Sequence, residues 1–240
     1  MSPSRSLLLF NEALRPDAVA RGYYPWLRDI DNPFFAAIPG VVHYTNWRVV
    51  ATPVGSVPFT HPDLMFLAGP EVLQTGLASP AAQEFVAGWV RLWGRFPEVA
   101  EPATNFNAYL SEEVAAPPGA ASQSETLVLI TYTPRDDAQE RGFEDWLRDV
   151  GSPTLNALPG VVSHSSWRIS EPAFGTPDYT HFDVLFAESR EHVSALLSDP
   201  AVRAFADGWV EQWGREPGGE LGDNFRLCVC QQIATSGPVR

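Results

Sequence analysis

Two short stretches of the sequence carry the same pair of ionisable side chains. FTHPDLMF places His61 two residues before Asp63, and YTHFDVLF places His181 two residues before Asp183. Alternate residues of a strand face the same side and lie ~6.6 Å apart, so this spacing lets a carboxylate hydrogen-bond an imidazole. Such a contact fixes the tautomer of the histidine and raises its basicity, as general acid/base catalysis requires. We therefore predict two candidate proton-transfer sites. The alternative is that each pair only satisfies buried polar groups beside a loop.

A second pair of segments differs in the position of its histidine. VVHYTNWR contains His43 and Tyr44, whereas VVSHSSWR carries a serine and then His164 at the same two places. A shift of one residue moves a side chain to the other face of a strand. This divergence is expected if one of two cavities has specialised, although a partly exposed strand also drifts freely. We expect His43, Tyr44 and His164 to supply further acid/base groups or to stabilise a developing enolate or phenolate.

Other side chains on the same strands are candidates for binding a substrate. An arginine could bind a carboxylate or phenolate, although salt bridges at the rim are commoner. Tryptophans at helical spacing belong more often to a core than to a pocket, so the tryptophans on strands are the better candidates. The predicted substrate-binding residues are Asn46, Trp47, Arg48, Phe59, Trp167, Arg168 and Tyr179.

Composition limits the class of protein. The chain has 240 residues, 45% of them hydrophobic, and a net charge of −13, which disfavours a nucleic-acid surface because phosphate binding needs clustered Lys and Arg. The N-terminal segment has an apolar run too short for a signal peptide or a membrane span. The two cysteines, Cys228 and Cys230, would point to the same face of a strand, a poor geometry for a disulfide. Free thiols and a cytoplasmic location are the prediction.

The chain repeats itself with an offset of 120 residues. WLRD, PGVV and the pattern GWV-x-x-WGR each occur twice, once in either half. Such extended self-similarity indicates a duplication. The segment 112–125, EEVAAPPGAASQSE, has the composition of a linker. We therefore predict a first repeat over 1–111, this linker, and a second repeat over 126–240.

Each repeat predicts the element order β-α-β-β-α-β. Apolar, β-branched segments alternate with two amphipathic segments, the second of which opens at Ser79-Pro80 and at Asp199-Pro200, pairs that favour a helix start. This order is that of a ferredoxin-like α+β unit with both helices on one face of an antiparallel sheet. The other face needs cover, and the sheet of the second repeat provides it. The predicted fold is a pseudo-dimeric α+β barrel formed within one chain.

The chain resembles the dimeric α+β barrel family, and its EthD-like branch in particular, with the usual two subunits fused in tandem. The residues that carry the resemblance are Trp26, Pro33, Pro39-Gly40 and Arg48, and in the second repeat Trp146, Pro153, Pro159-Gly160 and Arg168. The position of the histidine in the branch's motif is occupied by Asp31 and Gly151. The resemblance implies catalysis without a cofactor on a small hydrophobic, aromatic or polyketide-like molecule.

The strand that carries Thr-His-x-Asp presents two sets of side chains. We expect the more uniformly apolar set to lie under the helices, which places His61, Asp63, His181 and Asp183 inside the barrel. The predicted function is a lyase, isomerase or cyclase that uses no cofactor and no metal, since the sequence has no nucleotide, zinc or nucleophile-elbow motif. A cofactorless monooxygenase and a non-catalytic carrier or sensor are the alternatives. We expect a monomer or a homodimer of whole chains, with the first repeat holding the working site.

Overall fold

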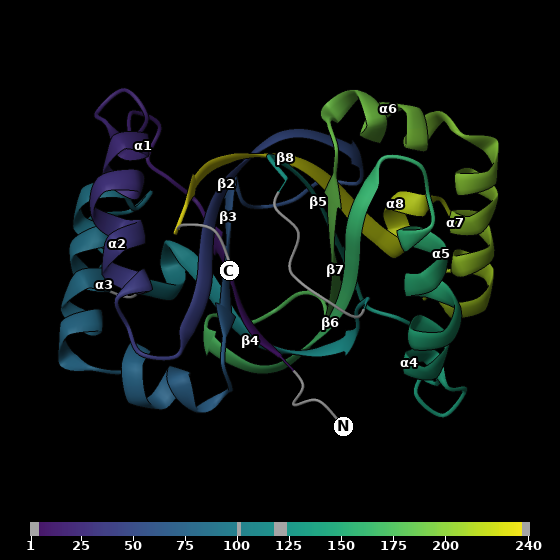
Figure 1. Ribbon diagram of the computed structural model, residues 1–240, viewed down its shortest axis with the longest axis horizontal. Coiled ribbons are helices and arrows are strands. Elements are labelled where there is room, and N and C mark those ends of the chain that lie inside the picture. Colours follow the sequence, from purple (N-terminus) through teal and green to yellow (C-terminus); the bar gives the residue numbers. More distant parts are fainter. Residues whose placement is uncertain (1–4, 100–101, 118–123, 237–240) are drawn as a thin grey trace.

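The computed structural model describes residues 5–99, 102–117 and 124–236, and they form one closed eight-stranded barrel with helices on two opposite sides (Figure 1). The first repeat contributes β1 (Ser6–Glu12), α1 (Tyr23–Trp26), α2 (Asn32–Ala36), β2 (Val41–Val54), β3 (His61–Leu67), α3 (Pro80–Trp93) and β4 (Phe106–Ala115). The second contributes β5 (Thr126–Tyr132), α4 (Phe143–Trp146), α5 (Ser152–Asn156), β6 (Val161–Phe174), β7 (His181–Ala187), α6 (Arg190–Ser198), α7 (Pro200–Trp213), α8 (Leu221–Asn224) and β8 (Phe225–Thr235). The predicted tandem α+β barrel is confirmed.

The barrel closes through two seams between the repeats. The strand order is β1-β3-β2-β8-β5-β7-β6-β4, and every neighbouring pair is antiparallel. The long strands β2 and β6 extend past their own sheets to pair with β8 and β4 of the other repeat. The four-residue stretch 112–115, predicted to belong to the linker, is the end of β4, because it pairs with β6. Residues 118–123 of that linker lie outside the described residues.

Local sequence explains where the helical elements begin and end. Ser79 and Asp199 cap α3 and α7, as predicted, by accepting hydrogen bonds from the amides of Ala82 and Ala201. Between α1 and α2, and again between α4 and α5, a wide π turn joins two short helices over 27–31 and 147–151. This turn sets the position of Gly151, which matters for the site below.

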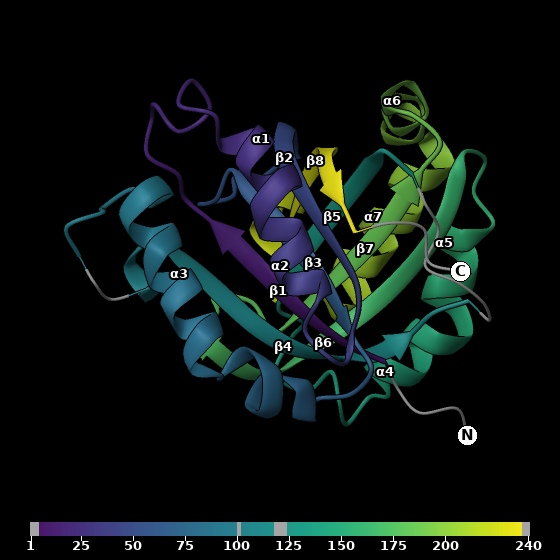
Figure 2. The same cartoon turned by 60° about the vertical axis from the view of Figure 1, so that its left-hand side comes forward.

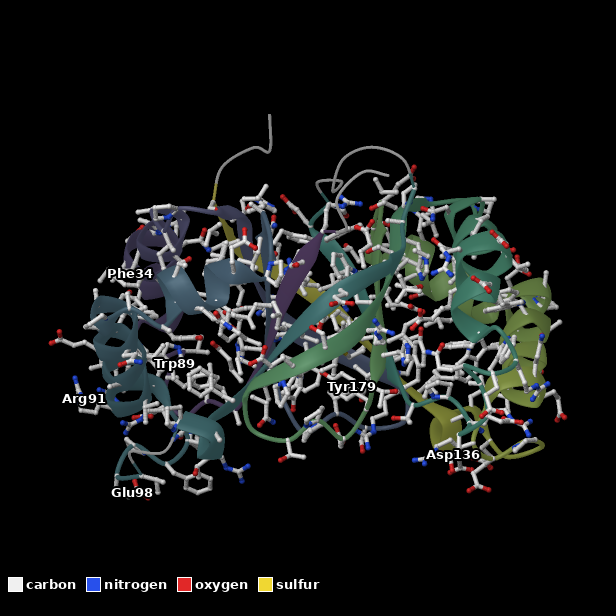
Figure 3. All side chains as sticks on the ribbon, turned by 90° about the horizontal axis from the view of Figure 1, so that it is seen from below. Phe34, Trp89, Arg91, Glu98, Asp136 and Tyr179 are labelled. Carbon is white, nitrogen blue, oxygen red and sulfur yellow. The ribbon has the colours of Figure 1, made fainter. Side chains whose placement is uncertain are left out.

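The barrel interior is filled by apolar side chains, and the helical layers lie outside it (Figure 2). Figure 3 shows Tyr179 in this middle region, whereas Phe34 and Trp89 belong to the helical layer of the first repeat. The interior cluster comprises Leu7, Leu9, Trp47, Phe59, Leu64, Phe66, Tyr109, Leu127, Leu129, Trp167, Tyr179, Phe182, Val184, Phe186, Cys228 and Cys230. The Sγ atoms of the two cysteines are 3.8 Å apart, so these thiols are free.

The side of the strand that faces the barrel was predicted wrongly. Leu64 and Phe66 belong to the interior cluster, and Met65 and Leu67 belong to the cluster under the helices. Strand alternation therefore places His61 and Asp63 under the helices. The same holds for His181 and Asp183, since Phe182 and Val184 face the interior. The physical reason is that eight strands enclose the interior on all sides, which makes it costly to place an ionisable carboxyl group there.

Closure within one chain leads to the first testable prediction. Every strand of the barrel has both neighbours in the same chain, so folding needs no second copy. The barrel should therefore stay folded when the protein is diluted about a hundredfold, and the midpoint of thermal unfolding of the monomer should stay constant, because only a folded oligomer makes it concentration-dependent. Differential scanning calorimetry with light scattering checks this. A midpoint that rises with concentration, together with a barrel that opens on dilution, would contradict the closed pseudo-dimer.

Candidate functional site

A cavity of about 350 Å³ lies between the sheet of the second repeat and its helices. This volume is within the usual range of small-molecule sites. Its wall is completed by the end of β2, which reaches across from the first repeat. The lining residues are Pro53, Val54, Ile130, Tyr132, Trp146, Leu147, Gly151, Leu155, His164, Asp183, Leu197, Val202, Arg203, Phe205, Ala206, Trp209, Leu221, Phe225 and Leu227. Most are apolar; Tyr132, His164 and Asp183 come from the sheet, and Arg203 comes from α7.

Three ionisable side chains from three neighbouring strands form the polar floor of this cavity. Asp183 lies on β7, between Tyr132 of β5 and His164 of β6. The Tyr132 hydroxyl donates to Asp183 Oδ1 at 3.0 Å, and His164 Nε2 lies 3.5 Å from Asp183 Oδ2. Among the described residues, His164 Nε2 has no hydrogen-bond partner. A bound molecule with a suitable polar atom would supply one.

Burial determines the protonation of the tyrosine. Tyr132 is 4% exposed, and burial together with the charge of Asp183 raises its pKa well above the ordinary value. Its hydroxyl therefore keeps its proton at neutral pH and acts as a donor to Asp183. His164 is 1% exposed, yet both it and Asp183 line the cavity. The floor thus combines a carboxylate, an imidazole and a neutral phenol in a mainly apolar pocket, where electrostatic interactions are stronger than in bulk water.

Aromatic rings form much of the cavity's wall. Trp146 stacks on Phe205 with ring centroids 5.9 Å apart, and Trp209 meets Tyr132 edge-on at 5.2 Å. Phe225 packs edge-on against Trp209. Surfaces of this kind favour a flat, mainly apolar ligand, because aromatic rings prefer offset or edge-to-face contacts.

Gly151 keeps the cavity open beside Trp146. A Cβ atom at this position would approach Cζ3 of Trp146 to 2.7 Å, so a larger residue would displace the indole ring. The first repeat has Asp31 here, and it has Phe35 at the position of Leu155. Both differences enlarge the space above His164 in the second repeat.

The first repeat has a cluster of buried acids at the corresponding place. Glu12, Asp31 and Asp63 are each at most 6% exposed. The hydroxyl of Tyr44 and the amide of Asn46 each donate to Asp63 Oδ2 at 2.8 Å. Burial raises the pKa of Asp63 to about 7, and burial with the charge of Asp63 raises those of Glu12 and Asp31 well above their ordinary values. The cluster therefore takes up protons that exposed carboxylates would release.

Phe35 separates this acid cluster from the cavity of its own repeat. Its ring packs edge-on against Tyr44 with centroids 5.3 Å apart. The cavity above it, about 460 Å³, is lined mainly by apolar residues of β1, α2, α3 and the end of β6, among them Leu8, Phe10 and Phe35. No carboxylate of the acid cluster is among its lining residues in the described part of the chain. The two repeats therefore share a fold and differ in access to their polar groups.

The hydrogen bonds predicted between His61 and Asp63, and between His181 and Asp183, are not formed. Each imidazole instead contacts the preceding threonine: His61 Nδ1 lies 2.8 Å from Thr60 Oγ1, and His181 Nδ1 lies 2.9 Å from Thr180 Oγ1. The aspartates turn to neighbouring strands, because cross-strand partners lie closer than the i+2 position.

Neither histidine of the Thr-His-x-Asp segments lines the cavities described above. Burial lowers the pKa of His61 to about 4, with the charge of Arg48 acting in the same direction. His181 stacks on the ring of Tyr132 at 5.8 Å and so supports it from the side. Its Nε2 is 3.8 Å from Glu144, and the proximity of His181 and Arg168 lowers the pKa of Glu144 to about 2. These contacts fit a packing role.

The other predicted residues are spread over three regions. Trp47, Trp167, Phe59 and Tyr179 belong to the barrel interior, and His43 faces the same side, stacked on Phe66. The arginines make polar contacts outside the cavity: Arg48 donates to Gln231 at 2.6 Å, and Arg168 pairs with Glu112 and Glu144. Asn46 belongs to the buried acid cluster. Of the predicted residues, the cavity of the second repeat brings together His164 and Asp183.

Four residues at or beside this cavity were not predicted as site residues from the sequence: Tyr132, Gly151, Ser152 and Asn156. A signal was present, since Tyr132 replaces Glu12 and Asn156 replaces Ala36 at corresponding positions of the repeats. Positions where duplicated halves exchange ionisable or polar groups indicate where their sites diverge.

Within the described residues, no group of three or more His, Cys, Asp or Glu side chains is arranged to hold a metal ion. None of the helices described is both long and apolar enough to cross a bilayer.

Comparisons with known proteins agree with this architecture. Residues 126–217 match the family model described as REDY-like protein HapK. A proposed monooxygenase from Fusobacterium nucleatum subsp. nucleatum superposes with a TM-score of 0.65 at 10% identity, covering 98% of this chain and 95% of that one. A proposed monooxygenase from Lactobacillus acidophilus NCFM gives 0.61 at 10% identity, covering 98% and 97%. An anthrone oxidase-like protein gives 0.64 at 13% identity, covering 99% and 95%. No curated protein sequence matches the chain significantly. At these identities the structural likeness concerns the fold.

Proposed function

We propose that this dimeric α+β barrel protein, fused in tandem, is a cofactor-independent enzyme whose working site is the cavity of the second repeat. The observation that supports this most is the floor of the cavity, where His164, Asp183 and Tyr132 meet in a mainly apolar pocket. A pocket for carriage alone needs apolar walls, whereas a pocket with convergent ionisable groups suits catalysis. The corresponding acids of the first repeat are closed off by Phe35.

The proposed reaction begins with proton transfer from a small, flat, mainly apolar molecule. The aromatic walls formed by Trp146, Phe205 and Trp209 would hold its rings, and one hydroxyl or activated C–H would face Asp183 and His164. Removal of that proton leaves the electron pair on the substrate as a phenolate or enolate. A neighbouring N–H donor would stabilise the anion in this mainly apolar pocket. Isomerisation, elimination or ring closure can follow from such an anion without any cofactor.

A cofactorless monooxygenase is the second candidate. The names of the similar structures favour it, since two are proposed monooxygenases and one is anthrone oxidase-like. In that case the same deprotonated substrate would react with dissolved dioxygen, which is the oxidant. Oxygen consumption that is stoichiometric with turnover would distinguish this reaction from an isomerase, lyase or cyclase. A carrier or sensor would bind the same molecules and leave them unchanged.

The site is tested first by binding. A ligand that binds the native state raises the melting temperature, so a thermal-shift screen of hydroxylated and ketone-bearing aromatic compounds identifies probes without knowledge of the reaction. We expect Leu155→Phe to weaken binding of such a probe at least ~tenfold. This substitution copies Phe35 of the first repeat, whose ring covers Tyr44.

A matched control separates a blocked pocket from a general effect of added volume. Leu92→Phe makes the same change at an exposed position of α3 and should leave the dissociation constant unchanged. Equal affinity of the wild type and Leu155→Phe for every probe would place the binding site elsewhere and remove the basis of the proposal.

A further inference from the structure

The amide of Asn156, at the end of α5, connects this helix to β6 beside His164. Its Oδ1 accepts the backbone N–H of His164 at 2.8 Å, and its Nδ2 donates to the backbone oxygens of Ser152 at 2.9 Å and of His164 at 3.1 Å. Because backbone donors and acceptors cannot exchange roles, these bonds fix which end of the amide is nitrogen. The orientation of Asn156 is therefore determined by the chain itself.

The same amide nitrogen also reaches the hydroxyl of Ser152. Asn156 Nδ2 lies 3.2 Å from Ser152 Oγ, and an amide nitrogen is a donor only, so it cannot accept the hydroxyl hydrogen of Ser152. Ser152 is 3% exposed, and its other side-chain partner among the described residues is His164 Nδ1, at 3.1 Å. If Nδ1 carried the proton, the hydroxyl hydrogen of Ser152 would be buried without an acceptor, which costs free energy. The hydroxyl therefore donates to Nδ1.

We infer that Asn156 is a positioning residue that, through Ser152, holds His164 as the neutral tautomer protonated at Nε2, and that Asp183 is consequently the group that accepts the substrate's proton. The surroundings of Nε2 favour the same tautomer. This atom lies 3.5 Å from Asp183 Oδ2, and an N–H group is more favourable beside a carboxylate oxygen than a lone pair is. With Nε2 already protonated, His164 cannot take up a proton there.

This inference rests on the proposed function and assigns its roles more closely. A proton leaves a substrate O–H or C–H and bonds to a carboxylate oxygen of Asp183, while the electron pair stays on the substrate. His164 Nε2–H and the Tyr132 hydroxyl remain donors throughout, one toward the developing anion and one toward Asp183 Oδ1. The proton returns from Asp183 to the product, so no oxidant is consumed in this step.

The relay formed by Asn156, Ser152 and His164 is present only in the second repeat, whose cavity reaches its polar floor. The positions that correspond to Asn156 and Ser152 are Ala36 and Asn32 in the first repeat. There the backbone of Tyr44 is held by Ser236, whose Oγ accepts the Tyr44 N–H at 2.8 Å. In the first repeat the strand is therefore held at this position without an asparagine, so Asn156 is not required merely to fix the strand.

Nitrogen-15 NMR of histidine-labelled protein tests the assignment without any substrate. His164→Gln identifies the signals of His164 among the five histidines. At pH 7.5 we expect an imidazole protonated at Nε2 and bare at Nδ1. A ring protonated at Nδ1, or at both nitrogens, would overturn the inference. A wrong tautomer would leave the cavity as the proposed site, which the binding test with Leu155→Phe examines separately, so the two failures are distinguishable.

Two further variants test the role of the relay. Asn156→Asp replaces the donor by an acceptor, so the Ser152 hydroxyl should turn toward residue 156 and the His164 ring should become protonated at Nδ1. Asn105→Asp is the control, because Asn105 makes the same kind of clamp on the backbone of Phe96, far from His164, and should leave the His164 signals unchanged.

Should Asn156→Asp fail to fold, Ser152→Ala and Ser152→Thr provide the same test. The alanine variant should give a mixture of tautomers, and the threonine variant, which keeps the hydroxyl, should restore the form protonated at Nε2. An unchanged single tautomer in Ser152→Ala would show that Ser152 and Asn156 do not set it.

Discussion

Turnover should fall by ~10²–10⁴-fold when Asp183 is replaced by Asn, because the proton acceptor of the proposed reaction is lost. Asn keeps the size of the side chain and an oxygen that can accept the hydrogen bond of the Tyr132 hydroxyl, which in the wild type is 3.0 Å long. The fold should therefore be retained, as judged by circular dichroism and the unfolding midpoint. The measurement is kcat on a substrate found among the compounds that stabilise the protein.

His61→Gln is the control for this prediction. His61 belongs to the repeated Thr-His-x-Asp segment, but it lies under the helices of the first repeat and lines neither of the two cavities that lie under the helical layers. We expect kcat to stay within about threefold of the wild type. The reverse pattern, with His61→Gln inactive and Asp183→Asn active, would show that the first repeat is the working half, as the sequence had suggested.

The protein's stability should decline as the pH rises from ~4 to ~8, and Asp63→Asn should remove much of that decline. Asp63 has a pKa near 3.8 when unfolded and of about 7 when folded, because burial disfavours its charge. Because its pKa is higher in the folded state, Asp63 loses its proton at a lower pH in the unfolded chain than in the folded protein. The stability contributed by the protonated form is complete below ~4 and disappears as the pH passes through ~7. Between these two limits the free energy of unfolding falls by roughly 4 kcal/mol because of Asp63 alone.

The asparagine of this variant would stay neutral at every pH and would keep an oxygen for the two donors that bind Asp63 Oδ2 in the wild type, Tyr44 and Asn46. Burial would still raise the pKa of Glu12, but removing the charge of Asp63 should relieve part of that upward shift. Urea unfolding at a series of pH values measures the effect. Asp29→Asn, at an exposed position where Arg28 lowers the pKa, is the matched control. Identical pH profiles for the wild type and Asp63→Asn would mean that Asp63 is ionised in the folded protein at low pH.

The sequence predicted the architecture because hydrophobic periodicity and a 120-residue repeat are encoded locally. The order of elements in each repeat, the caps at Ser79 and Asp199, and closure of the barrel within one chain followed from these patterns. The face of each strand did not follow. Alternation shows that His61 and Leu64 point to opposite sides, but which side is enclosed by eight strands depends on tertiary structure.

The site was only partly predictable for the same reason. His164 and Asp183 were identified as chemically capable, yet they were assigned to separate groups, because the contact between them joins different strands. Tyr132 looked like an ordinary strand residue until its hydroxyl was seen to meet Asp183. The shape of the cavity depends on Gly151 and Leu155, which are smaller than Asp31 and Phe35 at the corresponding positions of the first repeat. The cavity that these smaller side chains leave open can be recognised only in the folded protein.

The central claim is that ligands bind under the helices of the second repeat. The tryptophans make it directly measurable, because corresponding pairs lie in each candidate region. Trp146 and Trp209 line the cavity of the second repeat, Trp26 and Trp89 belong to the cluster under the helices of the first, and Trp47 and Trp167 lie in the barrel interior. Titration with a stabilising aromatic compound, followed by the indole N–H signals in proton–nitrogen NMR spectra, reports on all six. We expect the signals of Trp146 and Trp209 to shift and to saturate together, while the other four signals stay nearly fixed. Saturable shifts confined to Trp47 and Trp167, or to Trp26 and Trp89, would contradict it.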